Sequence, residues 1–92
     1  MRAKAGDATG ALTAYAGLLP HVLRLGGPDH HLTLSIRYNL AYWQGETGDA
    51  AGAVTAYAEL LPDMLRVLGP DHPDTLTTRH DLAYWQGKAG DR

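Results

Sequence analysis

Apolar residues return every three or four positions along two stretches of the chain, which is the spacing of one face of an α-helix. From about Asp7 to Leu25, this face carries Ala11, Tyr15, Leu18, Leu19, Val22 and Leu25. A later stretch repeats the pattern with Ala53, Tyr57, Leu60, Leu61, Met64 and Leu68. The alternation of apolar and polar residues that is typical of a β-strand is not found in the sequence. The pattern therefore predicts an all-α fold.

A second type of helix is predicted from about His31 to Thr47 and again from Pro73 to Ala89. Its first copy carries two neighbouring stripes. One stripe comprises Leu32, Ile36, Leu40, Trp43 and Thr47, and the other comprises Leu34, Arg37, Ala41 and Gln44. A helix with two such stripes is expected to be covered on both sides. Trp43 and Trp85 are accordingly expected to lie in the core.

Glycine and proline mark where these helices stop. The segments 26–29 (Gly-Gly-Pro-Asp) and 68–71 (Leu-Gly-Pro-Asp) combine a left-handed glycine with a following proline, which predicts a helix end. Gly48-Asp49 and Gly90-Asp91 are expected to form tight turns. The order predicted is long helix, glycine–proline loop, tryptophan helix and tight turn, followed by the same series again.

The predicted helix starts are less uniform. Asp7 and Asp49 are candidate N-caps, and Pro73 suits the first position of a helix, where its missing N–H costs nothing. Pro20 and Pro62 lie inside the apolar pattern, where a proline removes one backbone hydrogen bond. Two interpretations stay open at these prolines: one curved helix, or two short helices with a break.

The chain is a tandem repeat with a period of 42 residues. The segment Leu-Ala-Tyr-Trp-Gln-Gly at 40–45 returns unchanged at 82–87. Residues 6–47 and 48–89 align without a gap, and 27 of these 42 positions are identical. A single repeat domain over residues 1–92 is the expected organisation, because each repeat of such a chain packs against its neighbours.

The repeat resembles the tetratricopeptide repeat. The resemblance is carried by Asn39-Leu40-Ala41, the Gly48-Asp49 turn, Ala53 and Tyr57 four positions apart, and the segment 68–74 (Leu-Gly-Pro-Asp-His-Pro-Asp). The 42-residue period and the segment 68–74 are similar to those of the kinesin-light-chain-like subclass of this repeat, as it occurs in actinobacterial arrays. The resemblance implies a right-handed α-solenoid of four helices in the order B-A-B-A. Alanine replaces the frequent glycine at residues 41 and 83, and glutamine the frequent tyrosine at residues 44 and 86.

The family's A helices line a concave groove that holds a peptide, so the resemblance also implies a site. Matching Leu40 and Leu82 to the family's leucine gives the groove positions Ser35, Tyr38, Tyr42, Glu46, Thr77, His80, Tyr84 and Lys88, bordered by Asn39 and Asp81. Spacing by three and four places them on one helix face. The tyrosines are expected to offer flat contact area, or alternatively to pack on a neighbouring helix. Asn39, Arg37 and Arg79 are expected to hold a partner's backbone or carboxylates.

Composition narrows the class of partner. The net charge is −2 and the pI is near 6.1, so the chain has no basic surface for nucleic acid or for a membrane. No apolar run has the length of a membrane span, and no signal peptide is evident, so a soluble cytoplasmic protein is expected. Cysteine is absent, which excludes disulfides and thiolate metal sites. A protein or peptide partner remains.

Metal, cofactor and catalytic sites are not predicted. Asp29, His30 and His31 are consecutive, and Asp71, His72 and Asp74 cluster in the second loop. Adjacent turn residues rarely converge on a tetrahedral ion, so we interpret both clusters as turn and cap chemistry. No catalytic triad, acid pair or phosphate-binding loop stands out, and a non-enzymatic protein without a cofactor is expected.

The chain begins with a B helix and ends with an A helix, so two helices lack their partners. We expect exposed apolar residues at Leu12, Tyr15 and Leu19 at one end and at Leu82 and Trp85 at the other. Exposed apolar patches mark association sites, and the two ends are complementary. Two hypotheses follow: a module that binds a partner in the groove, or a natural or engineered fragment that stacks head to tail or forms a helix-exchanged dimer.

Overall fold

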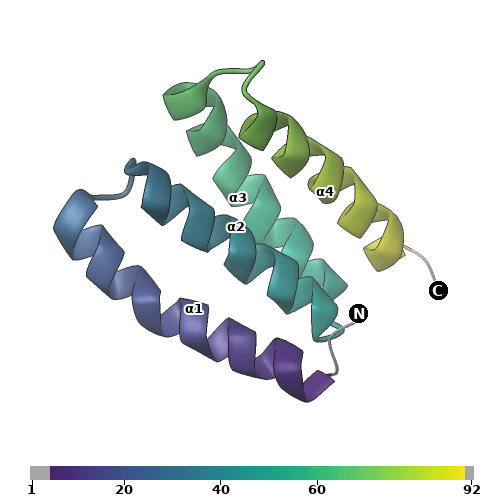
Figure 1. Ribbon diagram of the computed structural model, residues 1–92. Coiled ribbons are helices and arrows are strands. Elements are labelled where there is room, and N and C mark those ends of the chain that lie inside the picture. Colours follow the sequence, from purple (N-terminus) through teal and green to yellow (C-terminus); the bar gives the residue numbers. More distant parts are fainter. Residues whose placement is uncertain (1–4, 91–92) are drawn as a thin grey trace.

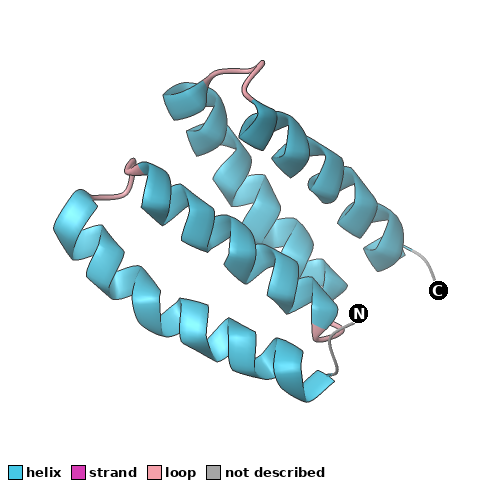
Figure 2. Ribbon diagram, viewed as in Figure 1, coloured by secondary structure: helices cyan, strands magenta, loops and turns pink. Residues whose placement is uncertain are grey.

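The computed structural model describes residues 5–90 of the chain, with the side chains from residue 7 onward. Four helices follow one another: α1 (Ala5–Gly26), α2 (His31–Glu46), α3 (Ala50–Leu68) and α4 (Pro73–Gly90) (Figure 1). The described residues contain helices and their connections but no strand (Figure 2). The all-α prediction is confirmed, and each predicted helix lies within a few residues of its observed bounds.

Successive helices run in opposite directions and pack on one another in chain order. Close backbone contacts join α1 with α2, α2 with α3, and α3 with α4. The two loops at residues 27–30 and 69–72 lie together at one end of the molecule, and the turn between α2 and α3 lies at the opposite end (Figure 1). None of the described helices combines the length and the apolar character that a bilayer span requires.

The loops contain the residues that the sequence predicted to end and start helices. Gly27 and Gly69 adopt φ of 84° and 93°, a left-handed conformation that favours glycine. The Nδ1 atoms of His30 and His72 accept hydrogen bonds from the backbone N–H groups of Leu32 and Asp74, at 3.1 and 3.0 Å. Interpreting the loop histidines as cap chemistry is therefore confirmed.

The cap prediction is right for one aspartate and wrong for the other. Asp49 precedes α3, and its Oδ1 accepts a hydrogen bond from the backbone N–H of Gly52 at 2.9 Å. Asp7 lies within the first turns of α1, because that helix begins already at Ala5. Pro20 and Pro62 lie inside helices that continue past them, so the alternative of two short helices is wrong. The turn predicted at Gly90-Asp91 falls partly outside the described residues, and Gly90 still belongs to α4.

The core lies between α2, α3 and α4. One cluster joins Ala41, Ala53, Tyr57 and Trp85, and a second joins Leu34, Leu60 and Met64. Of the two stripes predicted on α2, the one with Leu34 and Ala41 is the more completely buried, whereas Leu32 and Thr47 are exposed. Three buried threonines are also present, and all three donate to backbone oxygens: Thr33 to Gly27 and Thr78 to Asp74, both at 2.8 Å, and Thr75 to Met64 at 3.4 Å.

The two tryptophans are not equivalent. Trp85 is only 6% exposed, so its place in the core is confirmed and the expectation that it stays partly exposed at the chain end is wrong. Its ring covers Gly45 of α2 so closely that a Cβ atom at that glycine would lie 2.5 Å from Trp85 Cζ2. Trp43, at the same repeat position, is only half-buried. Leu12, Tyr15, Leu19 and Leu82 are half-buried, in agreement with the expected partial exposure.

Candidate functional site

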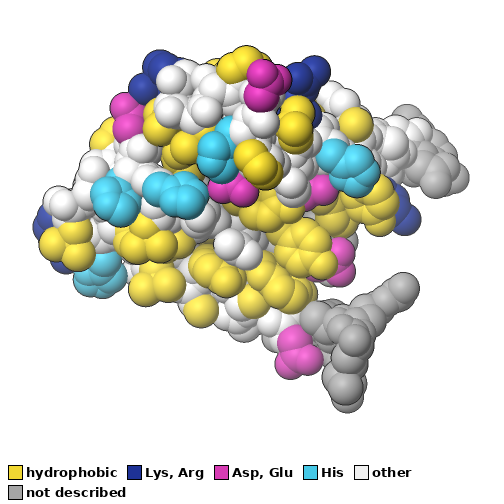
Figure 3. Space-filling view, turned by 45° about the horizontal axis from the view of Figure 1, so that its top comes forward, with side chains coloured by type: hydrophobic (Ala, Val, Ile, Leu, Met, Phe, Trp, Pro, Cys, Tyr) yellow, Lys and Arg dark blue, Asp and Glu magenta, His cyan; other side chains and the backbone are white. Residues whose placement is uncertain are grey.

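Side chains of α2 and α4 face each other along a line that we call the α2–α4 seam. Three hollows follow this seam, and together they are lined by every predicted groove residue: Ser35, Tyr38, Asn39, Tyr42 and Glu46 from α2, with Thr77, His80, Asp81, Tyr84 and Lys88 from α4. The positions are therefore brought together on one face, as predicted. Figure 3 shows one face of the molecule, on which hydrophobic side chains lie next to histidines and carboxylates.

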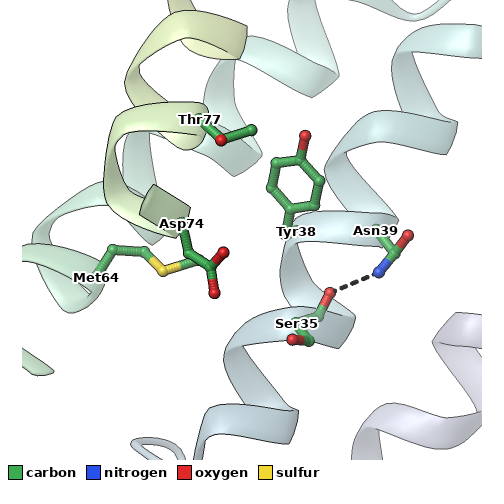
Figure 4. Close-up of a pocket in the computed structure, with 6 residues that line it drawn as sticks. All are labelled: Ser35, Tyr38, Asn39, Met64, Asp74 and Thr77. Atoms are coloured by element: carbon green, nitrogen blue, oxygen red, sulfur yellow. Dashed lines mark hydrogen bonds between the residues drawn. The ribbon is translucent and has the colours of Figure 1, made fainter. Parts of the chain in front are cut away.

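The first hollow lies near the loop end of the seam. It has a volume of about 100 Å³ and is lined by Ser35, Tyr38, Asn39, Met64, Asp74 and Thr77 (Figure 4). The Nδ2 of Asn39 donates to the backbone oxygen of Ser35 at 2.9 Å, so this amide is already bonded within its own helix. His31 Nε2 lies 3.2 Å from Asp74 Oδ2 and joins α2 to α4 above the hollow. This hollow can take a small side chain at most.

A polar bridge closes the seam between the first hollow and the next. The Tyr38 hydroxyl donates a short hydrogen bond to Asp81 Oδ2, and the Tyr57 hydroxyl donates to the same oxygen at 3.4 Å. The two tyrosine rings meet edge to face, with their centroids 5.5 Å apart. Burial raises the pKa of both phenols well above the usual value near 10, and the neighbouring Asp81 carboxylate adds to the shift at Tyr38. The main role of Tyr38 is therefore to connect α2 with α4 through its hydrogen bond to Asp81.

The second hollow is larger and more open. It measures about 280 Å³ and is lined by Tyr42, Glu46, His80, Asp81, Tyr84 and Trp85. Tyr42 and Tyr84 are 37% and 50% exposed, so their rings border the hollow without being covered by a neighbouring helix. Each ring packs edge to face on the tryptophan that follows it, at 5.0 Å in α2 and 4.9 Å in α4. This packing holds the tyrosines in place.

The third hollow lies at the end of the seam beside the α2–α3 turn. It measures about 410 Å³ and is lined by Gly45, Glu46, Gly48, Ala50, Tyr84, Trp85 and Lys88. The ammonium of Lys88 lies over the Tyr84 ring, 5.8 Å from its centroid, which is cation–π distance. Glu46 borders both this hollow and the second one. The wider half of the seam thus combines aromatic faces with a carboxylate.

The two arginines expected to serve the groove are placed differently. Arg37 Nη1 donates to Asp63 Oδ2 at 2.6 Å, so its charge is paired with α3. Arg79 is exposed. Sequence reasoning assigned Asp29 to turn chemistry and missed its ion pair with Arg66. The Asp29 carboxylate and the Arg66 guanidinium form two hydrogen bonds of 2.8 Å, and Arg66 also reaches Asp63 at 3.0 Å. The fixed three-residue spacing of Asp63 and Arg66 on one helix was an available signal for part of this network.

The remaining charged clusters give no metal site. Within residues 5–90, no group of three or more histidines and carboxylates is close enough to hold an ion. His80 Nδ1 lies 3.3 Å from Asp81 Oδ1, so this histidine is paired with the bridge rather than with a second histidine. Comparison with family models, with curated proteins and with solved structures finds no match to the chain.

Proposed function

We propose that the chain is a non-enzymatic interaction module that holds an extended peptide along the α2–α4 seam. In this proposal the four helices are tetratricopeptide-like pairs in the order B-A-B-A, at the start of a right-handed solenoid, and α2 and α4 are the A helices. The observation that carries it is that all ten expected groove positions line hollows on one face.

The residues around the second and third hollows favour a basic partner segment. Tyr42 and Tyr84 offer exposed aromatic area at a low cost in side-chain entropy. Glu46 forms no ion pair with another described side chain and borders both hollows, so it is available to a cation of the partner. The ammonium of Lys88 lies 5.8 Å from the centroid of the Tyr84 ring, which supports the proposal that the aromatic faces of this region attract a cation. A partner lysine or arginine would find an aromatic face and a carboxylate together.

The first hollow and the bridge limit how the peptide runs. Tyr38 and Asp81 cross the seam, so a peptide passes over this bridge and reaches into the seam on either side of it. The first hollow accepts a small side chain, and the wider hollows accept a long basic one. The preferred sequence would therefore place a small residue and a Lys or Arg on the same face of an extended chain.

Selection from a random peptide library tests the proposal, with fluorescence anisotropy on the enriched peptides. We expect enrichment of lysine- or arginine-containing peptides. Replacement of Tyr84 by Ala is expected to weaken their binding roughly tenfold, and Glu46→Gln to do so in a salt-dependent manner. Leu25→Ala is the matched control, because Leu25 is 83% exposed and lies outside the seam. Peptides that bind Tyr42→Ala/Tyr84→Ala as tightly as the unchanged chain would refute it.

A further inference from the structure

Residues 42 positions apart are equivalent in the repeat, but several pairs differ sharply in burial. Leu60 of α3 is fully buried, whereas Leu18 of α1 is 47% exposed. Leu34 of α2 is fully buried, whereas Leu76 of α4 is 49% exposed. In each pair the buried residue lies where α2, α3 and α4 meet, and the exposed residue lies where a further helix would continue the stack.

The less buried members of these and of the other equivalent pairs define two faces. The front face comprises Tyr15 and Leu18 of α1 with Trp43 of α2, and the rear face comprises Leu76, Ala83 and Gly87 of α4. Their equivalents inside the molecule are Tyr57, Leu60 and Trp85 on one side, and Leu34, Ala41 and Gly45 on the other. These six inner residues pack against one another in the two core clusters and at the Trp85–Gly45 contact.

We propose that the front face of one copy of the chain binds the rear face of a second copy. The α1–α2 pair of the second copy would lie on α4 as the α3–α4 pair lies on α2. The partner is identified by the repeat itself, since both faces carry residues whose equivalents already form this contact inside one molecule. Leu12 and Leu19 lie at the edge of this contact, because their equivalents Val54 and Leu61 remain half-buried even where the neighbouring helix is present, although Val54 packs against the inner cluster.

The most specific part of the contact is the packing of the Trp43 ring on the open backbone surface at Gly87, which we call the seat of Trp43. Inside the molecule, Trp85 lies on Gly45 with no room for a Cβ atom. Gly87 has nothing within 4 Å of its Cβ direction, so the equivalent seat is open. The Tyr42–Trp43 rings already have the 84° interplanar angle of the Tyr84–Trp85 rings. Trp43 is thus held in the orientation that this seat accepts, and little ordering is required on binding.

The charges support the same register. Arg66 pairs with Asp29 through two hydrogen bonds of 2.8 Å between neighbouring repeats. The equivalent residues are Arg24 at the front and Asp71 at the rear, and both are exposed. Three internal links are not reproduced. Arg37–Asp63 becomes Arg79 facing His21, His31–Asp74 becomes Leu32 facing Pro73, and Tyr38–Asp81 becomes His80 facing Asn39. The contact between copies therefore has fewer polar links than the one within a copy.

The ends of two helices must adjust when copies stack. Ala5 and Ala89 are two repeat lengths apart, so Ala5 of one copy and Ala89 of the next would occupy the same place in a continuous stack. Both are helical, because α1 begins at Ala5 and α4 continues to Gly90. One of these two terminal turns must unwind, which is inexpensive at a helix end. The contact is heterologous, so each added copy presents a new rear face and the assembly grows in one direction. These faces differ from the α2–α4 seam, so the inference stands independently of peptide binding.

Sedimentation equilibrium from micromolar to millimolar concentration tests the inference. The unchanged 9.9 kDa chain should rise in mass continuously with concentration. Gly87→Ala should weaken association roughly tenfold to a hundredfold, because the new methyl group fills the seat of Trp43. Gly17→Ala is the matched control: Gly17 is also helical and in open space, and its equivalent Glu59 is exposed in the internal contact. Both variants should melt at or above the temperature of the unchanged chain.

A mixing experiment tests the polarity of the contact. Leu18→Asp disrupts the front face and Gly87→Ala obstructs the rear face, so each variant alone should stay monomeric at concentrations where the unchanged chain associates. An equimolar mixture should form a complex of one copy of each that does not grow further. A chain that stays monomeric at millimolar concentration, a Gly87→Ala variant that associates as the unchanged chain does, or a mixture that stays monomeric would each overturn the inference.

Discussion

Replacement of Gly45 by alanine isolates one close-packed contact between the repeats, the one between Gly45 and Trp85. The added Cβ would lie 2.5 Å from Trp85 Cζ2 and 2.6 Å from Cε2 and Cη2, well inside van der Waals distance. These three atoms belong to one rigid ring, so the ring must move as a whole or the two helices must separate. Trp85 then loses part of the burial that leaves it 6% exposed.

The expected magnitude follows from two opposing effects. Overpacking of a close-packed core costs about 1–3 kcal/mol. Alanine is favoured over glycine inside a helix by up to about 1 kcal/mol, which offsets part of that cost. A net loss of about 1–2 kcal/mol in the free energy of unfolding is expected, below the roughly 3–5 kcal/mol for removing a buried tryptophan side chain altogether.

Urea denaturation followed by circular dichroism and tryptophan emission measures this loss. Gly87→Ala is the internal reference, because Gly87 is the same repeat position in open space and should gain stability where Gly45→Ala loses it. In a Trp85→Ala background the two alanine substitutions should become similar, since the obstacle is gone. Equal stability of Gly45→Ala and the unchanged chain, with unshifted tryptophan emission, would refute the packing argument.

Further predictions concern titration and the bridge. The Arg37 guanidinium, aided by Arg66, lowers the pKa of Asp63, so the stabilisation is present above the unfolded pKa near 4 and is lost as the pH falls through the lower folded value. Acid denaturation of Asp63→Asn should lack this component. Raised pKa values of Tyr38 and Tyr57 act in the opposite direction: their stabilisation is present below pH about 10 and is lost at higher pH, so phenolate absorbance of these two rings should appear only together with alkaline unfolding. Tyr57→Phe should cost about 0.5–1.5 kcal/mol in thermal denaturation through the lost hydrogen bond to Asp81, and no loss would remove Tyr57 from the bridge.

Local signals in the sequence predicted most of the fold. The glycine–proline segments, Asp49 and Pro73 fixed the helix limits because each acts through its own backbone conformation or its immediate neighbours. The residues predicted to share one face also line neighbouring hollows, since helical spacing determines which side chains share a face.

Features that depend on which residues are neighbours in space were harder to predict from the sequence. Trp43 and Trp85 occupy identical local sequences, but within the described residues only Trp85 lies on the tryptophan helix of the preceding repeat, where it covers Gly45 of α2. The Tyr38–Asp81 bridge joins residues 43 positions apart, and nothing in either segment specifies that they meet. Asp7 differs from Asp49 because Ala5 and Gly6, the described residues before it, already belong to α1.

The bridge between Tyr38, Tyr57 and Asp81 has a consequence for how this chain finds its native arrangement. Two repeats with 27 identical positions out of 42 offer nearly interchangeable apolar surfaces, so a helix can dock on the wrong neighbour during folding. Tyr38 and Asp81, however, are replaced by His80 and Asn39 at the equivalent positions. Correct docking buries a phenol on a carboxylate, and docking displaced by one repeat does not. The polar residues that differ between the repeats thus specify which helix docks on which neighbour, and the hydrophobic residues that are identical in both repeats cannot do so.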